Sequence, residues 1–210
     1  MIFYDYWRSS SAWRVRIALH LKRVAFERRP VNLRPGADQQ HSPEFRAVNP
    51  MGQVPVLITD DGYTVSESLA ILALLDERYP DPPLLPADSG RRARARQLAA
   101  MVVSGIQPYQ NLTLLTHLGK VGIAEPLDVA RHFNVRGLGA LERLAGETAA
   151  TFLVGDAVSL ADVCLIPQLY GARRFDVDLA PYPTLLRVEA ACAELPGFQA
   201  ARPEVQSDAA

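Results

Sequence analysis

Three consecutive serines, Ser9, Ser10 and Ser11, separate a short apolar and aromatic run from a stretch with helical periodicity. Residues 2–6 favour a strand and residues 12–22 favour a helix. The first backbone N–H groups of a helix are unpaired and its dipole favours negative charge, so a thiolate held there would be stabilised. A serine hydroxyl could also donate a hydrogen bond to that thiolate. Taken alone, the cluster is more simply explained by serines that only cap the helix.

Two further segments in the first 70 residues could contact a ligand. Val54 precedes Pro55, which pushes Val54 towards extended geometry. If the bond is cis, the Val54 backbone is turned outward, where it could pair with an extended ligand. Glu67 and Ser68 begin a helix directly after a strand, and Ser68 could hold a carboxylate through its N–H and hydroxyl groups. Taken singly, a turn proline and a helix cap are the simpler interpretations.

Composition argues against several other kinds of chemistry. The 210-residue chain has 22 basic and 23 acidic residues and a formal net charge of −1, which disfavours nucleic-acid binding through bulk positive charge. No apolar run reaches the roughly 18 residues that span a bilayer, and the N-terminus lacks a signal-peptide pattern. The two cysteines and four histidines have no metal-ligand spacing. We therefore expect a reduced, cytoplasmic protein without a metal site.

The first 80 residues predict the order β-α-β-α-β-β-α, which favours a mixed sheet with helices packed on it. The predicted elements cover residues 2–6, 12–22, 25–33, 45–49, 54–59, 63–65 and 66–79. The helix at 12–22 is expected to bury a stripe formed by Val15, Ala18, Leu19 and Leu21.

Residues 80–89 contain four prolines and predict a linker. Beyond it we expect helices only, over residues 91–117, 127–147, 159–170 and 185–195, with Pro108 interrupting the first. Ser159 and Asp162 have the spacing of a capping box. The expected organisation is an N-terminal domain over 1–80, a linker over 81–89 and an all-helical domain over 90–210.

Four longer motifs occur in the chain: RSSSAWRVRIAL at 8–19, NPMGQVP at 49–55, SGIQPYQNL at 104–112 and RFDVDLAPYP at 174–183. With the element order, they resemble the glutathione transferase superfamily, and most closely its zeta class. The resemblance implies an α+β fold, in which a thioredoxin-like N-terminal domain with a mixed four-stranded sheet precedes an all-α C-terminal domain. One departure is Ser11, which stands where the class usually has cysteine. A hydroxyl can donate a hydrogen bond there, but it is a poor nucleophile.

The resemblance also implies a cofactor and a set of site residues. Reduced glutathione is the expected cofactor, with Ser9 as the leading activator of its thiol and Ser10 and Ser11 as further candidates. The candidate cofactor-binding residues are Ser9, Ser10, Ser11, Ala12, Trp13, Arg14, Gln40, Val54, Pro55, Glu67, Ser68, Gln107, Asn111, Leu112 and Thr113. Gln40 is expected at the glycine end of glutathione, the Val54 main chain at its cysteinyl unit, and Glu67 with Ser68 at its γ-glutamyl end.

Two arginines are candidate anchors for a substrate with two carboxylates. Arg8 adjoins the serine cluster, and Arg174 begins the last of the four motifs. A guanidinium makes a bidentate pair with a carboxylate, which suits this role. A surface salt bridge is the alternative interpretation of each.

The reaction that the resemblance implies is the cis–trans isomerisation of maleylacetoacetate in aromatic catabolism, by thiolate addition, bond rotation and elimination. Maleylpyruvate is an alternative substrate, but that branch of the family tends to have histidine at the position of Gln107 and arginine after Asn111. Conjugation of α-haloacids and a GST-like interaction module without catalysis are further alternatives. The resemblance implies a homodimer, and we expect neither a nucleic-acid nor a membrane partner.

Overall fold

The protein is described by a computed structural model that covers residues 1–122 and 125–209. It divides into two compact units. The first unit comprises Met1–Pro83 together with the residues from Leu195 onward, and the second comprises Leu84–Glu194.

The first unit contains a four-stranded mixed sheet in the order β2-β1-β3-β4. The strands are β1 (Ile2–Asp5), β2 (Glu27–Pro30), β3 (Val56–Ile58) and β4 (Thr64–Ser66). β1 pairs in parallel with β2 and antiparallel with β3, and β3 pairs antiparallel with β4. The predicted mixed sheet is therefore confirmed, with β1, β2 and β3 shorter than predicted and β4 shifted by one residue.

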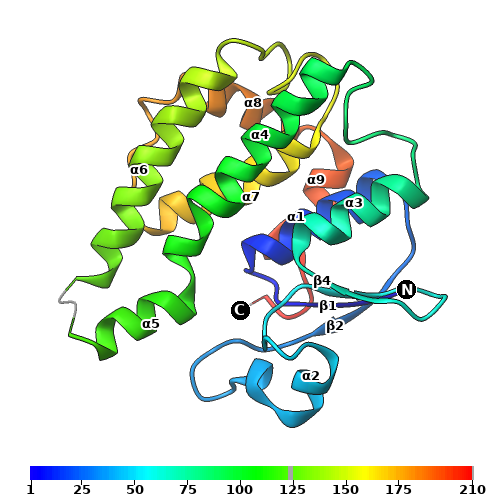
Figure 1. The fold of residues 1–210 in the computed structure, drawn as a ribbon, viewed down its shortest axis with the longest axis vertical. Helices are drawn as coiled ribbons and strands as arrows, with labels where there is room; N and C mark the ends of the chain where they lie inside the picture. The colour runs from blue at the N-terminus through cyan, green and yellow to red at the C-terminus, as the bar shows by residue number, and fades with distance from the viewer. Residues whose placement is uncertain (123–124, 210) are drawn as a thin grey trace. The chain divides into compact units, whose positions relative to one another are not determined.

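Helices cover both faces of this sheet. The helices of the unit are α1 (Ser10–Leu21), α2 (Pro43–Val48), α3 (Ser68–Arg78) and the short α9 (Pro196–Ala200), with 3-10 turns η1 (Gln39–His41) and η3 (Pro203–Val205). Figure 1 shows α1 and α3 side by side on one face of the sheet and α2 on the other side.

Helix α1 is buried more completely than its apolar stripe predicted. Every residue from Ala12 to Leu19 is buried, including Arg14 and Arg16, whereas Leu21 is only half-buried. The reason is that α1 packs against α3 and α9 as well as lying on the sheet, so it has no fully solvated face over these residues. Both arginines must then find partners inside the protein.

The second unit is built from helices: α4 (Ser89–Gly105), α5 (Leu112–Lys120), α6 (Pro126–Ala145), α7 (Leu160–Arg174) and α8 (Pro183–Ala193). α4 packs against α6 and α7. The helix expected over 91–117 is interrupted as predicted, because α4 ends at Gly105 and Pro108 lies in the 3-10 turn η2 (Gln107–Gln110). β pairing among the described residues of this unit is limited to isolated bridges at Gly155.

The capping box at the start of α7 is confirmed. The Asp162 carboxylate accepts hydrogen bonds from the Ser159 N–H and hydroxyl, both at 2.7 Å, and from the Leu153 N–H at 2.8 Å. Asp162 is fully buried, so these donors satisfy a charge that would otherwise be costly inside the unit.

The C-terminal residues depart from the expected domain boundaries. Residues after 194 were expected in the helical domain, but they pack in the first unit. Phe198 and Ala201 are buried, and Gly197 lies so close to Leu21 that an added Cβ would come within 2.9 Å of its Cδ2. Apolar burial against α1 thus places this segment with the sheet rather than with the helices that precede it.

The two cysteines, Cys164 and Cys192, are buried, and neither forms a disulfide. Burial raises the pKa of the Cys192 thiol, with the nearby carboxylates of Asp162 and Glu189 adding to the effect, so this thiol is inert. None of the helices in residues 1–122 and 125–209 has the length and apolar character needed to cross a membrane. In the same residues, no cluster of three or more histidine, cysteine or acidic side chains could hold a metal ion.

Candidate active site

Three segments singled out from the sequence leave the sheet at one edge. The register aligns Tyr4 of β1 with Val56 of β3, and Val56 with Ser66 of β4. Since β1 and β4 end at this edge and β3 begins there, the Ser9 turn, the Val54–Pro55 bond and the Glu67–Ser68 pair are brought together. Sequence spacing placed each segment beside a strand, but the strand order was needed to show that they converge.

Ser9 is the N-cap of α1. Its Oγ accepts a hydrogen bond from the Ala12 N–H at 3.3 Å, and its own N–H donates to the Tyr6 carbonyl at 3.0 Å. The hydroxyl proton can still be donated, because capping uses only the oxygen. Ser10 and Ser11 form the first turn and are half-buried. The site therefore combines a helix N-terminus with a hydroxyl donor, which is the arrangement that stabilises an anion.

Arg14 links the two helices that begin at this edge. Its side chain is fully buried, and Nη1 donates a hydrogen bond to Ser68 Oγ at 3.2 Å. A cation from α1 is thus held against the first residue of α3. Ala12 and Trp13 are also buried, so this part of the predicted cofactor-binding set lies inside the unit.

Glu67 has a strained backbone at the start of α3. Its φ is +68° and its ψ is 116°, a conformation that residues other than glycine rarely adopt. Such a conformation costs about 1–3 kcal/mol. The surrounding structure must hold this conformation in place, and such strain clusters at functional sites. The result is an exposed carboxylate beside the unpaired amides of the α3 N-terminus.

The Val54–Pro55 peptide bond is cis. Among the described residues, no backbone hydrogen-bond partner of Val54 is found, although the residue is 9% exposed and lies just outside β3. A buried backbone that lacks its ladder partners is suited to pair with an extended ligand.

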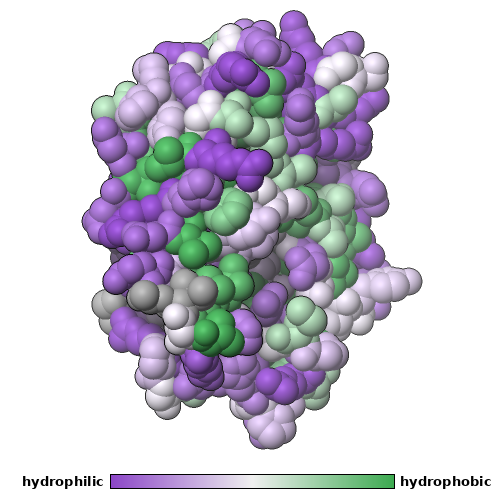
Figure 2. Space-filling view, turned by 60° about the vertical axis from the view of Figure 1, so that its left-hand side comes forward, coloured by the Kyte–Doolittle hydropathy of each residue, from purple (hydrophilic) through white to green (hydrophobic). Residues whose placement is uncertain are grey.

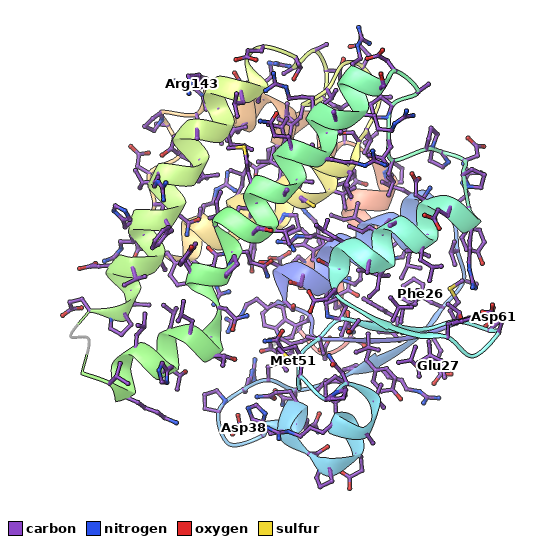
Figure 3. The ribbon with its side chains drawn as sticks, viewed as in Figure 1. Phe26, Glu27, Asp38, Met51, Asp61 and Arg143 are labelled. Carbon is purple, nitrogen blue, oxygen red and sulfur yellow. The ribbon has the colours of Figure 1, made fainter. Side chains whose placement is uncertain are left out.

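Gln40 lies beside the loop that leads to Val54. The side-chain Oε1 of Gln40 is buried and has no partner among the described residues, while Nε2 donates weakly to Asp38 at 3.4 Å. Gly52, at φ +62°, packs so tightly that an added Cβ would lie 2.8 Å from the Gln40 carbonyl. Figure 3 labels Asp38, which lies just before Gln40, and Met51, which lies in the loop that leads to Val54.

In the second unit, Gln107 begins η2, and Asn111 caps α5 by accepting a hydrogen bond from the Thr113 N–H at 2.9 Å. Leu112 and Thr113 are exposed in the first turn of α5.

A network of three amide side chains anchors η2. Gln110 exchanges hydrogen bonds with Gln168 at 3.2 Å and accepts one from Asn134 at 2.8 Å, and Gln168 donates to Asn134 at 2.7 Å. Asn134 and Gln168 are fully buried. Because the network is mutually satisfied, it fixes η2, and with it Gln107, on α6 and α7.

The two candidate substrate anchors lie in different units. Arg8 is half-buried, with its guanidinium 5.2 Å from the centre of the Trp7 ring. Arg174 is exposed at the C-terminal end of α7. The Arg131 guanidinium braces the residues that follow, since its Nε donates to the Phe175 carbonyl at 2.9 Å.

The sequence did not indicate a cluster of four charged residues, of which Asp5 and Arg16 are buried and Arg28 and Asp208 are half-buried. Charged residues usually indicate exposure, and no sequence signal pairs Arg28 with Asp208. A small hollow beside the cluster is lined by Tyr6, Trp7, Pro30, Asn32, Arg34, Gln39 and Asp208.

Comparison with known proteins agrees with these features. Models of the glutathione S-transferase N-terminal and C-terminal domains match residues 3–83 and 136–196. The maleylacetoacetate isomerase of Rattus norvegicus is 46% identical over 207 residues, which cover 99% of this chain and 94% of that protein.

Solved structures give the same result. A maleylacetoacetate isomerase from Anaeromyxobacter dehalogenans, with glutathione in its active site, is 51% identical over 100% of this chain and 97% of that one, with a TM-score of 0.91. A holo maleylpyruvate isomerase, a bacterial zeta-class transferase, is 40% identical over the full length of both chains, with a TM-score of 0.95.

The fold and the domain matches define a glutathione S-transferase. Within that superfamily, the chain belongs to the zeta-class family that includes the maleylacetoacetate and maleylpyruvate isomerases.

Proposed function

We propose that this protein is a glutathione-dependent isomerase that converts maleylacetoacetate to fumarylacetoacetate in tyrosine and phenylalanine catabolism. The observation that carries the proposal is the convergence of Ser9, Val54 and Glu67–Ser68 at one edge of the sheet. These groups offer an activating hydroxyl, an unpaired main chain and a polar helix start, which are the contacts that a γ-glutamyl tripeptide thiol needs.

The residues present fit glutathione. Val54 can pair with the cysteinyl peptide group through its main chain, and the orphaned Oε1 of Gln40 can accept a hydrogen bond at the glycine end. Glu67 can pair with the γ-glutamyl ammonium, while Ser68 and the α3 N-terminus can hold the γ-glutamyl carboxylate. When bound, glutathione supplies a thiolate that adds to the cis double bond, allows rotation about the resulting single bond and then leaves.

Ser9 favours the ionised form of the thiol by hydrogen bonding. A hydrogen bond to a charged group contributes about 1.5–3 kcal/mol, and a helix N-terminus adds roughly 0.3–1 kcal/mol. Together they amount to a pKa lowered by about one to three units from the usual value for a thiol near 8.5. Ser10 and Ser11 are further candidates for the same role. Ser11 cannot serve as a thiol nucleophile, which this reaction does not require.

Arg8 and Arg174 are proposed to bind the two carboxylates of the substrate. Each guanidinium can form a bidentate pair, which would orient the substrate and stabilise the negative charge that develops on its conjugated carbonyl. Gln107, Asn111, Leu112 and Thr113 are proposed to contribute further contacts. A desolvated pair of this kind is worth about 2–5 kcal/mol when one partner is removed.

Maleylpyruvate is the second candidate substrate, because a maleylpyruvate isomerase is among the full-length structural relatives. The glutamine at position 107 and the leucine after Asn111 favour maleylacetoacetate. The discriminating experiment measures kcat/KM for maleylacetone, a stable analogue of maleylacetoacetate, and for maleylpyruvate at saturating glutathione. We expect maleylacetone to be preferred. A preference for maleylpyruvate would overturn the substrate assignment and leave the reaction class intact.

We also propose that the protein is a cytoplasmic homodimer. Figure 2 shows hydrophobic side chains on the surface. Four large apolar side chains of α5, of α6 or of the residue after α5 are each about half exposed or more: Leu112, Val121, Leu127 and Val135. Apolar surface of this kind is commonly covered by a partner. Light scattering coupled to size-exclusion chromatography should give twice the chain mass, and a monomer mass at micromolar concentration would contradict the proposal.

A further inference from the structure

Four charged side chains form a compact cluster at the end of β1. Arg16 Nη1 lies 2.6 Å from Asp5 Oδ2, and Arg28 Nε lies 2.8 Å from Asp5 Oδ1. Arg28 Nη2 forms an ion pair with Asp208 Oδ1 at 2.6 Å. Two cations thus face two anions, and the Asp5 and Arg16 side chains are fully buried.

This cluster holds the turn that precedes Ser9. Arg16 Nη2 donates to the Trp7 carbonyl at 2.6 Å, and Nη1 also reaches the Tyr6 carbonyl at 3.4 Å. The Trp7 N–H in turn donates to Asp208 Oδ2 at 3.3 Å. Both main-chain polar groups of Trp7, two residues before Ser9, are therefore held by charged side chains.

Arg16 and Arg28 also bind the C-terminal segment, residues 201–208. Arg16 Nε donates to the Ala201 carbonyl at 3.2 Å, and Arg28 Nη1 donates to Ser207 Oγ at 3.3 Å. Residues 201–208 are thereby tied to α1 through Arg16, to β2 through Arg28 and to the turn after β1 through Trp7. Asp208 is the point at which the segment contacts the Ser9 turn itself.

The energetics favour a single arrangement of this cluster. Removing one partner of a buried ion pair leaves an uncompensated charge and is strongly destabilising. Burial opposes the charge on Arg28, but hydrogen bonds and attraction from Asp5 and Asp208 outweigh it and raise the pKa of this guanidinium. Loss of the Asp208 carboxylate therefore leaves Arg28 with Asp5 as its one anionic partner in the cluster, and it removes the acceptor of the Trp7 N–H at the same time.

We propose that Asp208 is a positioning residue: through the Trp7 amide and Arg28 it fixes the Trp7–Ser9 turn, so that the C-terminal segment sets the orientation of the Ser9 hydroxyl. The inference rests on the proposed role of Ser9 in activating the glutathione thiol. A merely structural role would stabilise the fold without altering the ionisation of that thiol.

The test compares Asp208→Ala, Asp208→Asn and Asp208→Glu in the full-length chain. Glu204→Gln is the matched control, since it neutralises an exposed acid in the same segment that has no contact with the cluster. One readout is acrylamide quenching of tryptophan fluorescence without glutathione. The chain has two tryptophans, Trp7 and Trp13, and both are nearly inaccessible in the intact structure.

The second readout is the pH titration of bound glutathione, followed through the ultraviolet absorbance of its thiolate, together with kcat/KM. We expect Asp208→Ala to increase quenching, to raise the titration midpoint by about one unit and to lower kcat/KM about tenfold at neutral pH. Asp208→Asn should lie between Asp208→Ala and wild type, since it keeps an acceptor for the Trp7 N–H. Asp208→Glu should be close to wild type in quenching, titration midpoint and kcat/KM. Glu204→Gln should match wild type in all three. Should Asp208→Ala not fold, Asp208→Asn, which keeps the side-chain shape, carries the test.

Unchanged quenching in Asp208→Ala would overturn the proposal, because the turn would not depend on Asp208. Increased quenching with an unchanged titration midpoint and kcat/KM would overturn it as well, since the contact would then be structural only. If wild type itself shows no ionised bound thiol and no turnover, the proposed function fails. The quenching comparison, which uses no glutathione, still decides whether Asp208 holds the turn.

Discussion

Replacing Ser9 by alanine should separate a structural loss from a chemical one, because the hydroxyl has two roles. As the N-cap of α1 it accepts a hydrogen bond from the Ala12 N–H at 3.3 Å. Loss of a serine N-cap costs about 1 kcal/mol, which lowers the unfolding temperature by about 2–4 °C in a chain of this size. As the proposed donor to the glutathione thiolate it contributes about 1.5–3 kcal/mol, or about one to two pKa units.

The assay follows from this division. Below the thiol pKa, a rise of one to two units should lower kcat/KM about 10- to 100-fold, and the deficit should shrink as the pH is raised. The pH profile of kcat/KM for maleylacetone measures both effects. Asp88→Ala is the control, since Asp88 caps α4 by accepting from the Arg91 N–H at 2.8 Å and has no proposed part in the chemistry.

Asp88→Ala should therefore lose stability to a similar extent while keeping the wild-type pH profile. Ser9 is not the activator if Ser9→Ala loses the expected stability and retains kcat/KM within about twofold at every pH. Ser10→Ala and Ser11→Ala, measured in the same way, would then show whether another serine of the cluster is the activator.

Three further predictions concern stability and reactivity. On α6, Gly139→Ala should raise the free energy of unfolding by up to about 1 kcal/mol, because nothing lies within 4 Å of the added Cβ. Gly137→Ala should be less stable than Gly139→Ala by about 1–3 kcal/mol, because its Cβ would lie 2.6 Å from Ile106 Cδ1. Equal urea unfolding midpoints for the two variants would contradict this difference in packing. The bidentate hydrogen bonds from Arg78 lower the pKa of Asp61 (labelled in Figure 3) to about 2. The pair therefore stabilises the folded protein fully above the unfolded pKa near 3.8, and this stabilisation is lost as the pH falls through about 2. Asp61→Asn should thus be slightly less stable than wild type at pH 6 and equal to it near pH 2, and a deficit that grows on acidification would reverse the sign. Cys164 and Cys192 should not react with a disulfide reagent in the native protein and should both react after denaturation; rapid labelling of either native thiol would contradict their burial.

Local patterns in the sequence were sufficient to predict most of the elements. The alternation of short apolar runs and helical stripes predicts the strand and helix order, and the Ser159–Asp162 spacing predicts a cap that the structure contains. Pro108 predicts the break after α4, because proline cannot continue a helix without losing a hydrogen bond.

Long-range partners could not be predicted in the same way. Arg14 and Arg16 lie in a helix whose apolar stripe indicated a single buried face, and their burial depends on α3 and on residues near 200. The pairing of Arg28 with Asp208 joins positions 180 residues apart, and no local pattern encodes it. For the same reason, the Ser9, Val54 and Glu67 segments were recognised singly, while their convergence required the strand register.

In the proposed function, this chain uses glutathione as a recycled cofactor to isomerise a cis double bond. The most direct measurement incubates the enzyme with excess maleylacetone and a small, known amount of reduced glutathione, and quantifies the trans product and the remaining free thiol together. We expect many molecules of trans product per glutathione, a constant thiol concentration and no product when glutathione is omitted. Loss of one thiol per molecule of substrate converted, or turnover without glutathione, would contradict the proposed function.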